Sequence, residues 1–259
     1  MGALQEDRRT RARSIIFADM DFTPLDSQTL YRRVVEIADQ KAPFTYLTTP
    51  NVDHLVRLSK EPQYRLLHES AWARVNDSRI LEALAKVDGL PLPAYTGADL
   101  TARLLVEAID PNEPVVIVGA SQAVITALQD KPGLRDIRWH QPPMGLRNKP
   151  DAIAQAAQFC ADNPARFYFI CVGHPQQELV AMAIKARGDA IGIGLCVGAS
   201  LEFFTGMRKR APLWMQSARL EWLHRLLSEP RVLWRRYLVE GPEIFRLWWQ
   251  WRNKAKIKR

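Results

Sequence analysis

Three short apolar runs constrain the fold most, because each ends in a glycine turn and is followed by a helical pattern. The runs span residues 114–118, 166–172 and 190–197. Apolar runs without polar alternation are typical of strands that are buried on both faces, as in a parallel sheet. Strand, glycine turn and helix in repeated order predict an α/β fold with a doubly wound, Rossmann-like, mostly parallel sheet. We expect ligands at the carboxyl ends of these strands.

The first quarter of the chain continues the same alternation. Residues 14–18 form one predicted strand, and a helical pattern follows Asp26. Residues 44–48 form a second predicted strand. A helix is expected from about Val52, because Asn51 is a good helix cap directly before it.

The last quarter of the chain differs from the rest in charge and in tryptophan content. Of the net charge of +8, residues 201–259 contribute +9 and all other residues contribute −1. Six of the eight tryptophans lie in the same stretch. The spacing from about Pro212 onward is helical throughout, so we predict an α/β core over residues 1–211 and a helical appendage over 212–259. Arginine beside tryptophan suits a surface that meets phosphate on one side and an apolar boundary on the other.

Cysteine usage and hydropathy indicate where in the cell the protein is located. The three cysteines show no Cys-x-x-Cys spacing, which is typical of a reducing compartment and predicts a cytoplasmic protein. No apolar run approaches the roughly 20 residues that a membrane-spanning helix needs. Residues 1–13 lack the apolar centre of a signal peptide. We therefore expect any membrane contact to be peripheral.

Two motif-like patterns have ordinary explanations that we favour. Asp19-Met20-Asp21 matches the Asp-x-Asp pair that holds a metal in some nucleotide-sugar enzymes, but two nearby carboxylates are common by chance. Gly192-x-Gly194 begins a pattern close to the dinucleotide fingerprint, yet Val197 stands at the third glycine position. A tight strand exit explains these glycines better than an NAD-binding enzyme does.

Two polar segments remain open from their residue types alone. Residues 174–178 lie at a strand-to-helix junction, where free backbone N–H groups suit a diphosphate. An ordinary capped helix, with its Gln and Glu facing water, fits equally well. For the triplet 76–78, Asn-Asp-Ser, we favour a helix cap, because Asp and Ser are common capping residues.

Taken together, segments along nearly the whole chain resemble one family. The matching segments, in chain order, are Thr49-Pro50-Asn51, Asn76-Asp77, Gly97-Ala98-Asp99-Leu100, Val172-Gly173-x-Pro175-x-Gln177-Glu178, Gly206, Arg210-Ala211-Pro212-x-Trp214, Leu220-Glu221-Trp222-Leu223-x-Arg225-Leu226 and Glu229-Pro230-Arg231. Their order and spacing resemble those of the WecG/TagA/CpsF family of bacterial glycosyltransferases over residues 14–240.

The resemblance implies a cytoplasmic enzyme on the membrane surface. Such enzymes transfer a hexose, with inversion, from a UDP-sugar to a sugar carried on polyprenyl diphosphate, without a metal or other cofactor. By the same resemblance Asp77 is the general base. The substrate-binding residues it implies are Thr49, Asn51, Gln177 and Arg210, together with Arg225, Arg231 and Arg235 from an appendage that closes over the active site.

Departures from the family pattern concern the identity of the donor sugar. Ser78 replaces the usual Gly, and Gln176 replaces the usual Lys. The Asn-Asp-Ser triplet and residues 236–242 are similar to exopolysaccharide glucosyltransferases of the xanthan type, which favours UDP-glucose as donor.

Two alternatives remain at this stage. One is a transferase of N-acetylmannosamine or its uronic acid, for polymers of the teichoic acid or enterobacterial common antigen type. The other is a nucleic-acid-binding module built on the basic tail. Of these partners we expect an anionic membrane surface and no nucleic acid. The sequence leaves open whether the chain forms a homo-oligomer.

Overall fold

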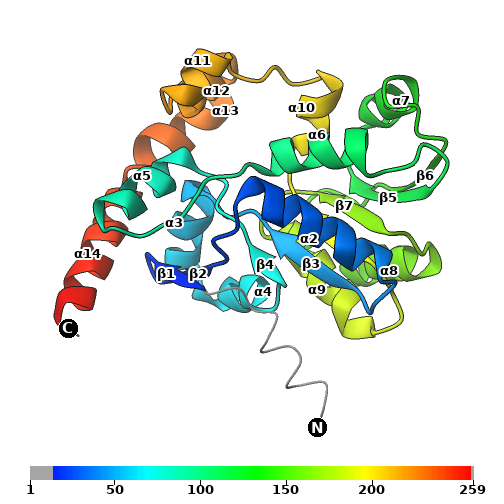
Figure 1. Cartoon of the computed structure of the whole chain (residues 1–259), viewed down its shortest axis with the longest axis horizontal. Helices are drawn as coiled ribbons and strands as arrows, with labels where there is room; N and C mark the ends of the chain where they lie inside the picture. Colours follow the sequence, from blue (N-terminus) through cyan, green and yellow to red (C-terminus); the bar gives the residue numbers. More distant parts are fainter. Residues whose placement is uncertain (1–13, 258–259) are drawn as a thin grey trace, which may run out of the picture.

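The computed structural model describes residues 14–257, with side chains through residue 254. Residues 1–13, for which the sequence predicts no signal peptide, lie outside the described residues. A central sheet carries helices on both of its faces, and the C-terminal helices run along one side of the molecule (Figure 1).

The central sheet has six strands in the order β4-β3-β8-β7-β5-β6. Every neighbouring pair is parallel. The strands are β3 (Thr45–Thr48), β4 (Ala73–Arg74), β5 (Pro114–Gly119), β6 (Asp136–His140), β7 (Phe167–Cys171) and β8 (Ile193–Cys196). This topology confirms the predicted doubly wound, parallel α/β fold.

Helices connect the strands and cover both faces of the sheet. They are α2 (Ser27–Asp39), α3 (Val52–Lys60), α4 (Arg65–Glu69), α5 (Arg79–Val87), α6 (Gly97–Glu107), α7 (Gln122–Asp130), α8 (Pro150–Asp162), α9 (Gln176–Arg187) and α10 (Ser200–Thr205), with short 3₁₀ turns at Pro62–Tyr64 and Leu146–Asn148. Buried side chains of α2, α6, α7 and α10 pack on one face, and those of α8 and α9 pack on the other.

Short polar residues fix where five of these helices begin. The side chains of Asp26, Asn51, Ser78, Thr96 and Ser121 accept hydrogen bonds from backbone N–H groups in the first turns of α2, α3, α5, α6 and α7. Such caps satisfy donors that a helix leaves free at its start. The expected cap at Asn51 is therefore confirmed.

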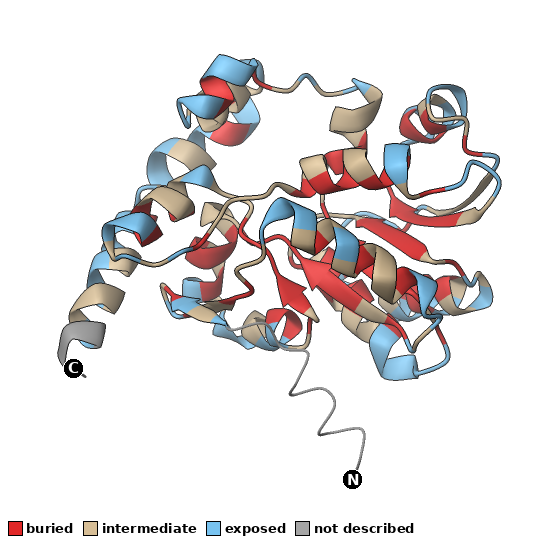
Figure 2. Cartoon of the chain, in the orientation of Figure 1, coloured by how far each residue is buried: buried red, intermediate tan, exposed pale blue. Residues whose placement is uncertain are grey.

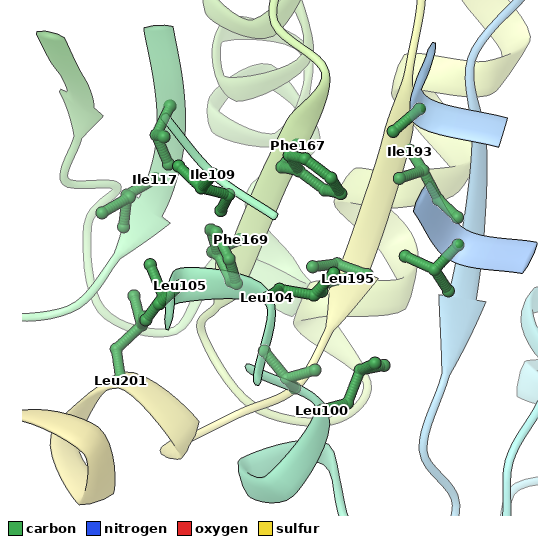
Figure 3. Close-up of a cluster of buried hydrophobic side chains, with 14 of the residues drawn as sticks. Leu100, Leu104, Leu105, Ile109, Ile117, Phe167, Phe169, Ile193, Leu195 and Leu201 are labelled. Atoms are coloured by element: carbon green, nitrogen blue, oxygen red, sulfur yellow. The ribbon is translucent and has the colours of Figure 1, made fainter. Parts of the chain in front are cut away.

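The core lies between the sheet and its helices. Figure 2 shows the central strands and the inward sides of the flanking helices as buried. In Figure 3 the buried side chains of α6, such as Leu104, lie against Phe167 and Phe169 of β7 and Leu195 of β8. The central strands are apolar on both faces because helices cover both.

Two strands of the sheet and one separate hairpin were not foreseen. The strands are β4, only two residues long, and β6, which is half-exposed throughout at the sheet edge. The predicted strand at residues 14–18 is β1 (Ile15–Phe17). It pairs with β2 (Met20–Phe22) in an antiparallel hairpin outside the main sheet.

The C-terminal stretch is helical, as predicted. It comprises α11 (Leu213–Ser217), α12 (Glu221–Ser228), α13 (Pro230–Trp234), the π-helical turn η3 (Arg235–Glu240) and α14 (Glu243–Ile257). The last helix packs on α3 and shares a hydrophobic cluster with the N-terminal hairpin, through Ile244, Trp248 and Trp251. None of the helices in the described part of the chain is both long enough and apolar enough to cross a membrane.

Candidate active site

A cavity of about 700 Å³ opens at the carboxyl ends of four neighbouring strands. The segments after β3, β4, β7 and β8 supply its walls, with Thr49, Asp77, His174 and Gly198 among the lining residues. Residues of α12, η3 and α14 also line it. Parallel α/β sheets bind ligands at this edge, so this cavity is the candidate active site.

Asp77 is held in the cavity by its neighbours rather than by its own side chain. Its backbone N–H donates to the Pro50 carbonyl at 3.0 Å. Ser78, the next residue, caps α5, and Asn76 Oδ1 accepts from the Ser78 N–H. The capping prediction for this triplet is thus met by Ser78. Within the described residues, the Asp77 carboxylate has no hydrogen-bond or ion-pair partner.

The surroundings of Asp77 favour its protonated form. Burial raises its pKa to about 8, and the nearby carboxylate of Glu221 acts in the same direction. Arg225 and Arg210 act against them but do not cancel them. A carboxylate with a pKa near neutrality can exchange a proton at physiological pH, which is the property that a general base needs.

The pKa of Asp99, a second carboxylate beside the cavity, shifts in the opposite direction. Arg210 forms a bidentate pair with it, with Nη1 at 2.6 Å and Nη2 at 3.0 Å from its two oxygens, and also contacts Thr96. Burial alone would raise the pKa of Asp99, but hydrogen bonds from Arg210 and Thr96 lower it overall. Arg210 therefore lies beside the cavity, outside its lining, and is occupied by Asp99.

Thr49 and Asn51 line the cavity, and both also make internal hydrogen bonds. Thr49 Oγ1 donates to the Cys196 carbonyl at 3.0 Å, which ties the end of β3 to the end of β8. The Asn51 side chain caps α3 and contacts His54 Nδ1 at 2.9 Å. These two residues fix the shape of the wall that a substrate would meet.

Gln177 is almost fully buried, with 2% of its surface exposed. Its Oε1 accepts from the Gly198 N–H at 3.0 Å, and its Nε2 donates to Glu178 Oε1 at 2.8 Å. Glu178 is buried as well. The interpretation in which Gln177 and Glu178 face water is therefore wrong, because both lie inside the wall. Gln177 lines the cavity and holds the Gly198 turn in place.

The cavity is lined by basic side chains from both parts of the chain. The lining arginines are Arg57, Arg79, Arg208, Arg219, Arg225 and Arg236. Some of them are paired, since Arg57 and Arg236 both contact Asp53. Among the described residues, no acidic side chain lies within ion-pair distance of Arg79, Arg219 or Arg225. These three cations are available to a phosphate group.

Of the three appendage arginines expected at the site, only Arg225 lines the cavity. Arg231 and Arg235 are exposed, and Arg235 pairs with Glu240. The reason is helical geometry around the buried Leu233. A helix turns by about 100° per residue, so positions two before and two after Leu233 lie on the outer face.

Arg236 is the arginine that this geometry turns inward. It stands three positions after Leu233, on the same face of the helix, and it lines the cavity with Tyr237. Sequence reasoning missed Arg236 as a site residue because the inner face of this helix had not been located. The sequence offers no signal for it, because Val232 and Trp234 beside Leu233 are apolar as well.

The two weaker sequence patterns lie away from this cavity. Asp19 and Asp21 belong to the β1–β2 hairpin, and Asp21 pairs with Arg74 at 3.2 Å. Gly194 lies inside β8, where a Cβ atom would approach the ring of Phe44 to 2.6 Å. Close packing therefore requires glycine there, and the dinucleotide interpretation loses its support.

Comparison with known families agrees with this geometry. The sequence model of the glycosyl transferase WecG/TagA/CpsF family matches residues 15–258, nearly the whole chain. The chain belongs to this family and is a glycosyltransferase that acts on a sugar donor and a lipid-linked acceptor.

Proposed function

We propose that this member of the WecG/TagA/CpsF family is an inverting transferase in exopolysaccharide biosynthesis. It moves a hexose, glucose, from a UDP-sugar to a sugar on polyprenyl diphosphate at the cytoplasmic face of the membrane. The observation that carries the proposal is the unpaired Asp77 carboxylate, which shares one cavity with three unpaired arginines.

Asp77 acts as the general base of a single displacement. Its carboxylate accepts the proton of the acceptor hydroxyl while that oxygen bonds to C1 of the donor hexose. The bond from C1 to the UDP oxygen breaks on the opposite face, so the configuration at C1 inverts. A base in this position typically contributes about 10²–10⁴-fold to the rate.

Arginines stabilise the departing UDP. Negative charge builds on the diphosphate as the glycosidic bond breaks, and preorganised cations in a cavity offset it. Arg79, Arg219 and Arg225 lie in the lining without acidic partners, so no metal ion is required in this role. The start of α9, next to Gly173 and His174 in the lining, adds the positive end of a helix dipole.

The C-terminal helices provide the membrane contact. Exposed apolar side chains gather on them, namely Leu213, Trp214, Leu227, Val232, Trp234, Leu238, Val239, Phe245 and Trp249. Amphipathic tryptophans and basic residues favour the headgroup region of an anionic leaflet. We expect this apolar surface to lie on the bilayer.

Two side chains join this apolar surface to the cavity. Leu238 and Phe245 line the cavity and are 55% and 53% exposed. A lipid-linked acceptor could thus leave its polyprenyl chain in the bilayer while its sugar enters the cavity. The connection favours a lipid-borne acceptor over a nucleic acid as the partner of the basic tail.

A donor screen tests the proposal directly. The full chain is incubated with a synthetic glucosyl-diphosphate-lipid and each of several UDP-sugars, and the glycolipid product is identified by mass spectrometry. Glucose transfer that forms a β-linkage from the α-configured donor is expected. Transfer of N-acetylmannosamine instead would refute the choice of sugar, and no transfer from any UDP-hexose would refute the reaction.

A further inference from the structure

A second group of chemically active side chains lies in the wall of the cavity. His54 of α3, His174 after β7 and Glu178 of α9 place one ligand atom each within 4.8 Å of one another. Their side chains expose only 9%, 5% and 0% of their surfaces. A third histidine, His68 of α4, lies with its ring centre 5.4 Å from that of His174. We call these four residues the histidine cluster.

Asn51 offers His54 Nδ1 two contacts that require opposite tautomers. Its side-chain Oδ1, which already accepts from two backbone N–H groups, lies 2.9 Å from Nδ1, and its backbone N–H donates to Nδ1 at 3.3 Å. The shorter contact is a hydrogen bond only when Nδ1 carries the proton, because the oxygen can only accept. In that tautomer the opposite nitrogen, Nε2, presents a lone pair.

That lone pair faces another acceptor. His54 Nε2 lies 3.8 Å from Glu178 Oε1, and it is buried with no hydrogen-bond partner among the described residues. Two acceptors that face each other in a buried place repel unless a positive charge lies between them. On the other side of the carboxylate, Glu178 Oε2 lies 3.1 Å from His174 Nδ1.

The spacing of these atoms suits a transition metal. Zinc binds imidazole nitrogen and carboxylate oxygen at about 2.0–2.2 Å, so the ligand atoms of a tetrahedral site lie about 3.3 Å apart. Glu178 places one oxygen 3.1 Å from His174 Nδ1 and its other oxygen 3.8 Å from His54 Nε2, and these distances lie on either side of that value. His68 adds a further buried nitrogen, because its Nε2 has no partner while its Nδ1 contacts Thr48 at 3.1 Å.

We propose that the histidine cluster binds one divalent transition-metal ion of the zinc type. His54, His174 and Glu178 are its ligands, and the buried ring of His68 lies beside that of His174. Metal-bound imidazoles usually hold a hydrogen bond through their other nitrogen, and ligating carboxylates are themselves hydrogen-bonded. Asn51 on His54 and Gln177 on Glu178 supply these supporting bonds.

The ion would fasten α3 to the start of α9 from within the wall. Both supporting residues, Asn51 and Gln177, also line the cavity. The ion therefore has a positioning role for that wall, separate from the neutralisation of the diphosphate, which the unpaired arginines perform. This inference is independent of the sugar and of the transfer reaction.

Metal content and spectroscopy test the proposal on the full chain, purified without a polyhistidine tag. Isothermal titration of chelator-treated protein with Zn²⁺ should give one bound ion per chain. Titration with Co²⁺ should give the intense visible absorption of a tetrahedral site. His54→Gln and Glu178→Gln should each weaken binding by more than the about 10–100-fold that is usual for a lost supporting residue.

His140→Gln is the matched control, because His140 also has an unpartnered buried nitrogen but lies on β6, outside the cluster. It should bind zinc as the wild type does. Absence of zinc binding by the wild type, or equal binding by His54→Gln, would overturn the site and leave a shared proton as the bridge. X-ray absorption of the zinc-loaded wild type counts imidazole ligands without any variant, and a shell without imidazole would also overturn it.

Discussion

Asp77→Asn should make the protein more stable while removing its activity. An asparagine has the shape of a protonated aspartate but cannot ionise. Because the folded state raises the pKa of Asp77 to about 8, ionisation of this group opposes folding. Below about pH 4 the carboxyl is protonated in both folded and unfolded chains, so the substitution changes little.

The sign of the effect follows from linkage. Between about pH 4 and pH 8 the unfolded chain has released this proton while the folded chain retains it, so the wild type loses stability as the pH rises. The shift from 3.8 to about 8 spans about four units, at about 1.4 kcal/mol each. The ceiling is about 6 kcal/mol above pH 8, and solvent in the open cavity reduces it to a few kcal/mol.

Denaturant unfolding of wild type and Asp77→Asn from pH 4 to pH 9 measures this difference. The free energies of unfolding should agree near pH 4 and diverge steadily in favour of the variant. Asp99→Asn is the matched control of opposite sign. Arg210 and Thr96 lower the pKa of Asp99 despite its burial, so that variant should lose stability at pH 9.

Turnover supplies the second readout. Asp77→Asn should lower kcat by about 100-fold or more, with donor binding retained. Wild-type kcat/KM should rise with pH as Asp77 becomes ionised and should level off above an apparent pKa of about 8. A constant stability difference at all pH values, or near-normal turnover in the variant, would refute the reasoning.

Three further predictions concern other parts of the site. Arg225→Ala should lower kcat/KM by about 100-fold, more than Arg235→Ala, and steady-state kinetics of both variants would expose an error if the order were reversed. Gln177→Ala leaves the half-buried Gly198 N–H without its side-chain partner, at a cost of at most about 1–3 kcal/mol. It should lower the melting temperature and reduce protection by UDP in a thermal-shift assay, and unchanged protection would contradict the placement. Replacing Trp214 and Trp234 together by serine should abolish sedimentation with anionic vesicles without lowering the melting temperature, and full sedimentation would argue against the membrane surface.

The strands that the sequence predicts well are those buried on both faces. The strands β5, β7 and β8 are buried along nearly their whole length, so their apolar pattern in the sequence is continuous. The edge strand β6 is half-exposed and carries Asp136 and Arg138, which pair with each other. Its pattern is mixed because solvent covers part of it, and β4 is too short to leave a pattern at all.

The sequence could likewise place only some of the residues of the candidate site. The segments after β3 and β7, with Thr49 and Gln177, could be placed at one edge from topology alone. Asp77 follows the unforeseen strand β4, so only the family resemblance pointed to it, and all three residues line the cavity. The inward arginine of η3 could not be chosen without knowing which face of its helix packs inward. The histidine cluster was not foreseen, because His54 and His174 are far apart in sequence.

The contact between the hairpin and the last helix has a consequence for synthesis on the ribosome. Phe17 packs against Trp251 with ring centres 5.3 Å apart, and Ile244 is buried in the same cluster. A nascent chain therefore carries this hydrophobic cluster incomplete until residues 244–251 have emerged, since contacts this distant along the chain form late. The C-terminal helices that line the cavity also emerge late. We expect a chain without residues 244–251 to expose the apolar side chains of the hairpin and to lack a complete cavity.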